Sequence, residues 1–238
     1  MDVYERRYRL RNHHVGLGRK LKTATLFEFL EEASIAHTEA LDMGRDKTLD
    51  RGLLWVILQQ DLTIFRMPSY DEMITVRSWP GDTMHLLFPR YYEILDEEGT
   101  CIIEGSALWA LIDENTRKAV FPEPHGIIIN GNPNERKIDL PNAVHRRDTD
   151  HRETFVVPYH MCDLNGHLNN THYFDIFEDF FYKDREPVNY SRIEAEYLSE
   201  VRLHEELSLS YGENEEDLFM EGSVKGKSAF RIRAKKAL

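Results

Sequence analysis

The chain has 238 residues, a formal net charge of −12 and 41% hydrophobic residues, which suffices for one large domain or two small ones. The acidic balance argues against nucleic-acid binding, and no apolar run is long enough to span a membrane. The N-terminus lacks a signal-peptide pattern, and Cys101 and Cys162 are the only cysteines, so we expect a cytoplasmic protein with reduced thiols.

The first half of the chain predicts one strand, one long helix and four further strands. Residues 4–11 alternate well enough to form a strand, and from 25 to about 43 apolar residues recur at helical spacing. Runs rich in β-branched and aromatic residues follow at 53–66, 72–79, 86–95 and 101–113. An antiparallel sheet wrapped around the helix would bury its broad apolar stripe.

Residues 122–150 interrupt this order, and the same order then returns. We interpret this proline- and glycine-rich segment as a linker, whose apolar residues 127–129 would be exposed unless something covers them. After it, the patterns predict a strand at 153–159, a helix at 169–182, and strands near 191–200, 205–211, 217–224 and 228–235. This internal repeat predicts two domains of similar fold, at 1–121 and 151–238.

The second predicted helix is preceded by a stretch dense in polar, bond-forming side chains. Asp163, Asn165 and His167 alternate around Gly166, which permits a sharp turn, so they can project towards one small volume. Asn169 or Asn170 is the expected N-cap, and the unpaired N–H groups of the helix start would favour a developing anion. The alternative is an asparagine- and aspartate-rich turn that only caps the helix.

The stretch resembles the helix-entry loop of hot-dog-fold thioesterases, whose signature Asp-x-Asn-x-His-x-Asn-Asn, followed by an aromatic residue, ends here at Tyr173. The equivalent loop of the first half, 13–22, lacks it. A tandem hot-dog with chemistry only in its second half resembles the acyl-(acyl carrier protein) thioesterases, the family of the plant oleoyl-type enzymes and bacterial relatives. Segments similar to that family also occur at 30–37, 54–56, 66–71, 106–113, 116–118, 122–123 and 196–200.

The resemblance implies an α+β fold of two tandem hot-dog domains, each an antiparallel sheet around one long helix, packed as a pseudo-dimer. It also implies hydrolysis of acyl-(acyl carrier protein) to free fatty acid by activated water. We expect Glu200 as the base, withdrawn from water by surrounding strands, with Asp163 as the alternative. Asn165 and His167 would orient water and thioester, and the helix start at Asn169 and Asn170 would polarise the carbonyl.

A covalent mechanism is less favoured. Where some family members carry a cysteine after the glutamate, this chain has Val201, which cannot attack a thioester. Cys162 adjoins Asp163, but neighbouring residues of an extended segment point to opposite sides. The histidines lack zinc-ligand spacing, and no nucleotide-binding motif occurs, so we expect neither a metal nor a cofactor.

Substrate recognition is predicted at two places. Candidates for the acyl-chain pocket are Phe27, Leu30, Trp55 and Trp109. The expected partner is acyl carrier protein with its phosphopantetheine-linked acyl chain; because that partner is acidic, docking should use basic residues, for which Arg6, Arg7, Arg9, Lys225, Lys227, Arg231 and Arg233 are candidates. An acyl-CoA thioesterase and a non-catalytic acyl-binding module stay open as alternatives, as does dimerisation of the full chain.

Overall fold

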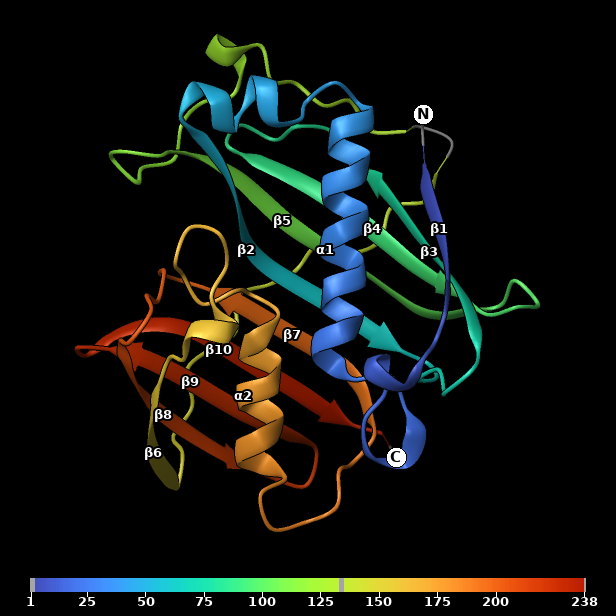
Figure 1. The fold of residues 1–238 in the computed structure, drawn as a ribbon, viewed down its shortest axis with the longest axis vertical. Helices are drawn as coiled ribbons and strands as arrows, with labels where there is room; N and C mark the ends of the chain where they lie inside the picture. The colour runs from blue at the N-terminus through green and yellow to red at the C-terminus, as the bar shows by residue number, and fades with distance from the viewer. Residues whose placement is uncertain (1–2, 133–134, 238) are drawn as a thin grey trace.

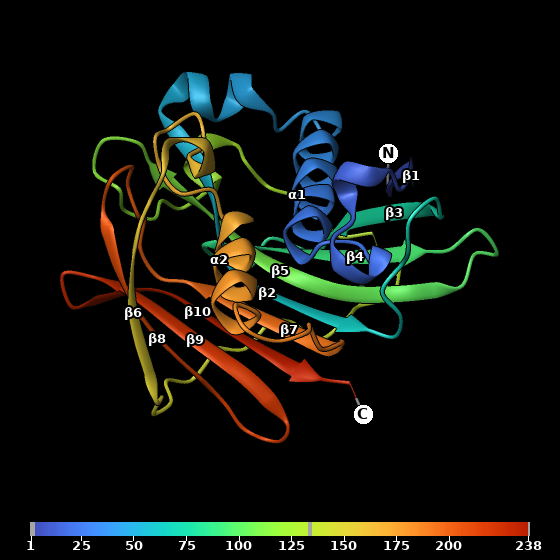
Figure 2. The same cartoon turned by 60° about the horizontal axis from the view of Figure 1, so that its bottom comes forward.

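The computed structural model describes residues 3–132 and 135–237, which form one ten-stranded sheet and two α-helices. Helices α1 (Thr23–Ala40) and α2 (His172–Phe181) lie on the same face of the sheet (Figures 1 and 2). The strands of the first half are β1 (Tyr4–Arg9), β2 (Leu53–Ile64), β3 (Met73–Pro80), β4 (Leu87–Leu95) and β5 (Cys101–Asp113). Those of the second half are β6 (His151–Val156), β7 (Tyr190–Tyr197), β8 (Glu206–Glu213), β9 (Asp217–Val224) and β10 (Lys227–Lys236).

The strand order repeats the internal symmetry of the sequence. The order is β1-β3-β4-β5-β2-β7-β10-β9-β8-β6. Counted outward from the central pair β2 and β7, the strands of the two halves follow in equivalent order. The equivalent strands β2 and β7 pair antiparallel, with Gln59 opposite Glu196 and Thr63 opposite Arg192. Each half thus covers the open strand edge of the other, as expected for sheets that would otherwise expose unpaired backbone groups.

The helices bury their apolar faces against the sheet and against each other. Leu26, Phe27 and Leu30 of α1 are fully buried, and the Phe27 ring stacks on Phe174 of α2 with centroids 3.8 Å apart. α1 ends at Ala40, earlier than the expected end at about position 43, and Asp42 shortly after it takes the left-handed conformation (φ 60°). None of the helices in the described part of the chain is long and apolar enough to cross a lipid bilayer.

The segment between the halves packs against the sheet over much of its length. Ile127 and Ile129 are buried in a small cluster with Leu53, Phe88 and Leu111, which accounts for their apolar character. Further along, the Trp79 indole N–H donates to the Arg136 carbonyl (3.2 Å), and the Ser106 hydroxyl donates to the Asp139 carbonyl (2.6 Å). These bonds satisfy backbone groups of a segment without regular structure.

Candidate active site

The loop before α2 is a compact turn organised by one carboxylate. Asp163 Oδ1 accepts the backbone N–H groups of Asn165 (2.8 Å) and His167 (3.0 Å), and the Asp163 N–H donates to the His167 carbonyl (2.8 Å). Gly166 takes the left-handed conformation that the turn requires (φ 75°). Asp163 therefore shapes the loop, and no contact between its carboxylate and the His167 ring occurs among the described residues' hydrogen bonds.

Backbone bonds hold this loop against the chain that follows β7. The Leu168 N–H donates to the Val201 carbonyl (2.7 Å), and the Leu203 N–H donates to the Gly166 carbonyl (3.1 Å). As a result, His167 Nε2 lies 3.6 Å from Glu200 Oε2. Glu200 itself lies beyond β7, which ends at Tyr197, so the expectation that it is part of the strand was wrong.

The surroundings of Glu200 also differ from the expectation. Strands do not withdraw it from water, because its side chain is 35% exposed. Instead it is paired with a cation: Arg117 Nε donates to Glu200 Oε2 (3.1 Å), and Arg117 Nη2 donates to Oε1. Arg117 belongs to the turn after β5 of the first half. Arg117 lies in segment 116–118, which is similar to the family, but no pattern in the sequence indicates a role for it.

The start of α2 lies later than predicted. The helix begins at His172, because Asn169 Oδ1 accepts the N–H (2.8 Å) and the hydroxyl (2.7 Å) of Thr171, and the Asn169 carbonyl accepts the His172 N–H (3.1 Å). Asn169 therefore already occupies two N–H groups near the helix start. Among the described residues, the buried Asn170 Nδ2 has no acceptor at hydrogen-bonding distance, although the Glu31 carboxyl lies close enough to interact with it. The Asn170 carboxamide lines the cavity with the Glu31 carboxyl nearby.

A cavity of about 1130 Å³ opens between the two halves beside this loop. Of the four residues predicted for the acyl-chain pocket, Trp55 and Trp109 line this cavity, whereas Phe27 and Leu30 are fully buried in the core. They lie on the face of α1 that meets the sheet and α2. The cavity is lined by the neighbouring face of α1, with Glu28, Glu31, Ser34, Ile35 and Thr38.

Several side chains that line the cavity have shifted pKa values, and those of Glu31 and Cys162 concern groups close to the loop. Burial, together with the charges of Glu32 and Asp163, raises the pKa of Glu31 to about 7. Burial also raises the pKa of the Cys162 thiol, with a further contribution from Asp163. The Cys162 thiol is therefore kept protonated and is a poor nucleophile.

The basic residues proposed for docking divide into three groups. Arg231 and Arg233 are paired with the buried carboxylates of Glu221 (3.0 Å) and Asp217 (2.8 Å), which makes them unsuitable as free docking cations. The second group is Lys225 and Lys227, which are both exposed, and Lys227 lines the cavity.

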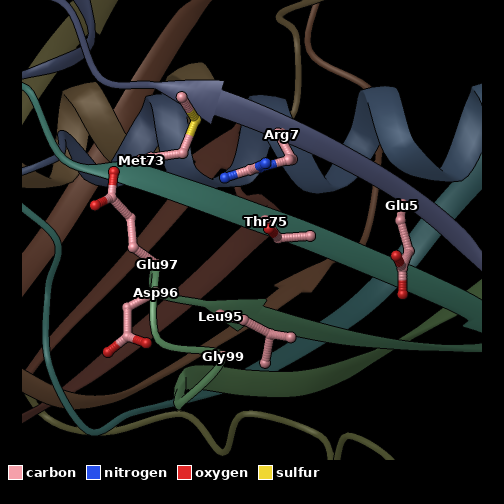
Figure 3. Close-up of a pocket in the computed structure, with 8 residues that line it drawn as sticks. All are labelled: Glu5, Arg7, Met73, Thr75, Leu95, Asp96, Glu97 and Gly99. Atoms are coloured by element: carbon pink, nitrogen blue, oxygen red, sulfur yellow. The ribbon is translucent and has the colours of Figure 1, made fainter.

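The third group lies on β1, at the far edge of the sheet from the second half. Tyr8 of β1 stacks on Phe29 of α1, so its neighbours Arg7 and Arg9 point to the opposite face. There Arg7 borders a depression of about 500 Å³ that the acidic residues Glu5, Asp96 and Glu97 also line (Figure 3). Arg9 is paired with Asp71 and Glu97, each at 3.6 Å.

The fold and the loop together define a class of protein. Two halves that each wrap a sheet around one helix, with the polar loop at the second helix only, form a tandem hot-dog fold. The same fold occurs in an acyl-ACP thioesterase from Bacteroides thetaiotaomicron (TM-score 0.82, 21% identity, 99% of this chain and 98% of that one). It also occurs in the 12:0-ACP thioesterase from Umbellularia californica (TM-score 0.82, 18% identity, 100% and 98%).

Sequence comparison identifies the family. The family model for the acyl-ACP thioesterase N-terminal domain matches residues 1–124, and that for the C-terminal domain matches residues 144–234. The chain therefore belongs to the acyl-ACP thioesterase family.

Curated plant proteins are also similar to this chain. An acyl-[acyl-carrier-protein] hydrolase from Cuphea viscosissima is 22% identical over 190 residues, covering 72% of this chain and 45% of that protein. A dodecanoyl-[acyl-carrier-protein] hydrolase from Cinnamomum camphora is 23% identical over 188 residues, covering 73% and 49%. The chain thus spans about half the length of the curated relatives it matches.

Proposed function

We propose that this protein hydrolyses the thioester of acyl-(acyl carrier protein), releasing free fatty acid and thereby terminating fatty acid synthesis. The observation that carries the proposal is the Glu200–His167 pair in the wall of the cavity between the halves, which the Asn170 carboxamide also lines. The choice of substrate is supported by the match to the acyl-ACP thioesterase family and by relatives that are named acyl-[acyl-carrier-protein] hydrolases. A cavity of this size, with Trp55 and Trp109 in its wall, suits an acyl chain.

The proposed chemistry uses the side chains in distinct roles. Glu200 takes a proton from a water molecule, and the oxygen of that water attacks the thioester carbonyl carbon. His167 orients the water relative to the Glu200 carboxylate. The Asn170 Nδ2–H stabilises the oxyanion that forms on the carbonyl oxygen. The intermediate then breaks its carbon–sulfur bond, and the proton passes to the sulfur, so the products are a carboxylic acid and the thiol of the carrier.

The partner in this proposal is acyl carrier protein, which presents the acyl chain on a flexible phosphopantetheine arm. The arm would enter at the Lys227 side of the cavity, where the thioester reaches Glu200 and the acyl chain continues between α1 and the sheet. The cytoplasmic location and a further dimer of the full chain remain predictions from the sequence.

The test is a comparison of donors. One acyl group is offered on acyl carrier protein and on CoA, and the release of both free thiol and free fatty acid is measured. We expect faster hydrolysis of the carrier-protein substrate. A clear preference for the CoA ester would make the protein an acyl-CoA thioesterase, and binding without thiol release above background would make it an acyl-binding module.

A further inference from the structure

We propose that Arg117 is a positioning residue for Glu200, so that a side chain from the first half completes the active site of the second half. The inference deepens the proposed function and rests on it for the role of Glu200. The two residues are 83 positions apart in the sequence, and the interface between the halves brings them together.

The contact is two-pronged and includes the oxygen that faces His167. Arg117 Nε donates to Glu200 Oε2 (3.1 Å), and Nη2 donates to Oε1, so the guanidinium fixes the plane of the carboxylate. The same Oε2 lies 3.6 Å from His167 Nε2. Among the described residues, the Glu200 carboxylate has no hydrogen-bond or ion-pair partner besides Arg117 and His167, and its side chain is 35% exposed. Arg117 therefore sets the angle at which Glu200 meets the imidazole.

The turn that carries Arg117 is built to present it. Asp113 Oδ1 accepts the N–H groups of Asn115 (3.2 Å) and Thr116 (2.7 Å), and the Asp113 carbonyl accepts the Arg117 N–H (2.9 Å). Arg117 adopts φ 56°, in the left-handed region that glycine tolerates and that other residues adopt at a cost. An arginine in a position where glycine fits more easily indicates that the guanidinium, and not the backbone, is what the position requires.

This backbone geometry allows a variant that separates function from folding. Arg117→Gly removes the guanidinium and at the same time relieves the left-handed conformation, so the melting temperature should stay the same or rise. With Glu200 free to rotate, we expect kcat for acyl-carrier-protein hydrolysis to fall by about tenfold to a hundredfold, with KM nearly unchanged. Lys118→Gln, at the exposed neighbour in the same turn, is the matched control and should leave kcat unchanged.

Two further measurements identify Glu200 as the residue through which Arg117 acts. In a Glu200→Gln background, Arg117→Gly should cause little additional loss, because the carboxylate to be oriented is already absent. Guanidinium ion at millimolar concentration should restore part of the activity of Arg117→Gly and none of that of Glu200→Gln. Should the glycine variant fold poorly, Arg117→Lys provides the same test, since it keeps the charge and loses the paired geometry.

Other outcomes would overturn the proposal. A loss confined to KM, and only with the carrier-protein substrate, would mean that Arg117 binds the phosphate of the arm. An equal loss in the Glu200→Gln background would mean that it acts elsewhere.

NMR chemical shifts of the His167 imidazole, recorded at one fixed pH, distinguish failure of this inference from failure of the proposed function, because they need no turnover. Arg117→Gly should change these shifts, because the Glu200 carboxylate that faces Nε2 at 3.6 Å then changes its orientation, and Arg117→Gly should cause no such change in a Glu200→Gln background. This change in a protein that hydrolyses no thioester would refute the function alone. Unchanged His167 shifts in Arg117→Gly would refute the inference.

Discussion

Asp163 and Glu200 are both carboxylates at the proposed site, but different partners hold them. Backbone N–H groups of the loop occupy Asp163, whereas Arg117 and His167 flank Glu200. Glu200 is therefore the carboxylate suited to meet a water molecule, and Asp163 builds the turn. The alternation of polar residues around Gly166 predicted which loop residues gather. No local pattern could give the contact with Arg117, which depends on how the two halves pack.

Two buried carboxyls lead to a prediction about stability. The pKa of Glu31 is raised to about 7, and burial raises that of Glu178 on α2, which accepts a bond from the Thr23 hydroxyl (2.5 Å), to about 7 as well. Both have an ordinary value of 4.5. Below that value both states of the protein bind the proton. Between pH 4.5 and 7 the unfolded chain releases these protons while the folded state keeps them, so the free energy of unfolding falls across this window and levels off above pH 7.

Glu31→Gln and Glu178→Gln should remove this cost. Each should raise the free energy of unfolding by up to about 3 kcal/mol at pH 8 and by little at pH 4.5. Thermal melts at both pH values measure the effect, with Glu98→Gln, at an exposed position away from both groups, as the control. A gain of the same size at both pH values would show that the proton is not involved.

At the scale of elements, hydrophobic periodicity predicted every strand and both helices, and the boundaries were less accurate. α2 starts at His172 and not at 169 because Asn169 bonds to Thr171 before the helix begins. The pocket face of α1 was also misplaced. The apolar face of α1 is broad enough to contact the sheet, α2 and the cavity. The periodicity of the sequence does not distinguish which of its residues contact which of these three surfaces.

The turn between β9 and β10 is the docking element that we predict. Lys225→Glu with Lys227→Glu should raise KM for acyl carrier protein severalfold, because an acidic partner would then meet like charge near the cavity. Hydrolysis of a small neutral thioester should change far less, and added salt should weaken the wild-type reaction with the carrier protein. Arg6→Glu with Arg7→Glu, on β1, is the comparison. A larger effect from the β1 pair would move docking to that edge.

At the scale of the whole molecule, the junction of β2 and β7 joins the halves and supports the site. Arg192 Nε donates to Asp61 Oδ1 across it (2.8 Å). The Tyr197 hydroxyl lies 3.0 Å from Gln60 Oε1 and 3.3 Å from the Asn170 carbonyl, which links the junction to the helix-entry loop. The internal repeat predicted two similar halves. Which edges pair, and that Arg117 crosses between the halves, depends on three-dimensional packing.

The most direct test of the central claim is the rate at which the full chain releases free thiol from acyl-(acyl carrier protein), measured for the wild type, Glu200→Gln and Cys162→Ala. The mechanism predicts that Glu200→Gln lowers kcat by about a hundredfold or more with folding retained, since it removes the base. It predicts that Cys162→Ala leaves kcat nearly unchanged, because that thiol is protonated and bonds to the Pro158 carbonyl at 3.7 Å. An inactive Cys162→Ala beside an active Glu200→Gln would contradict the water mechanism and replace it with a covalent one.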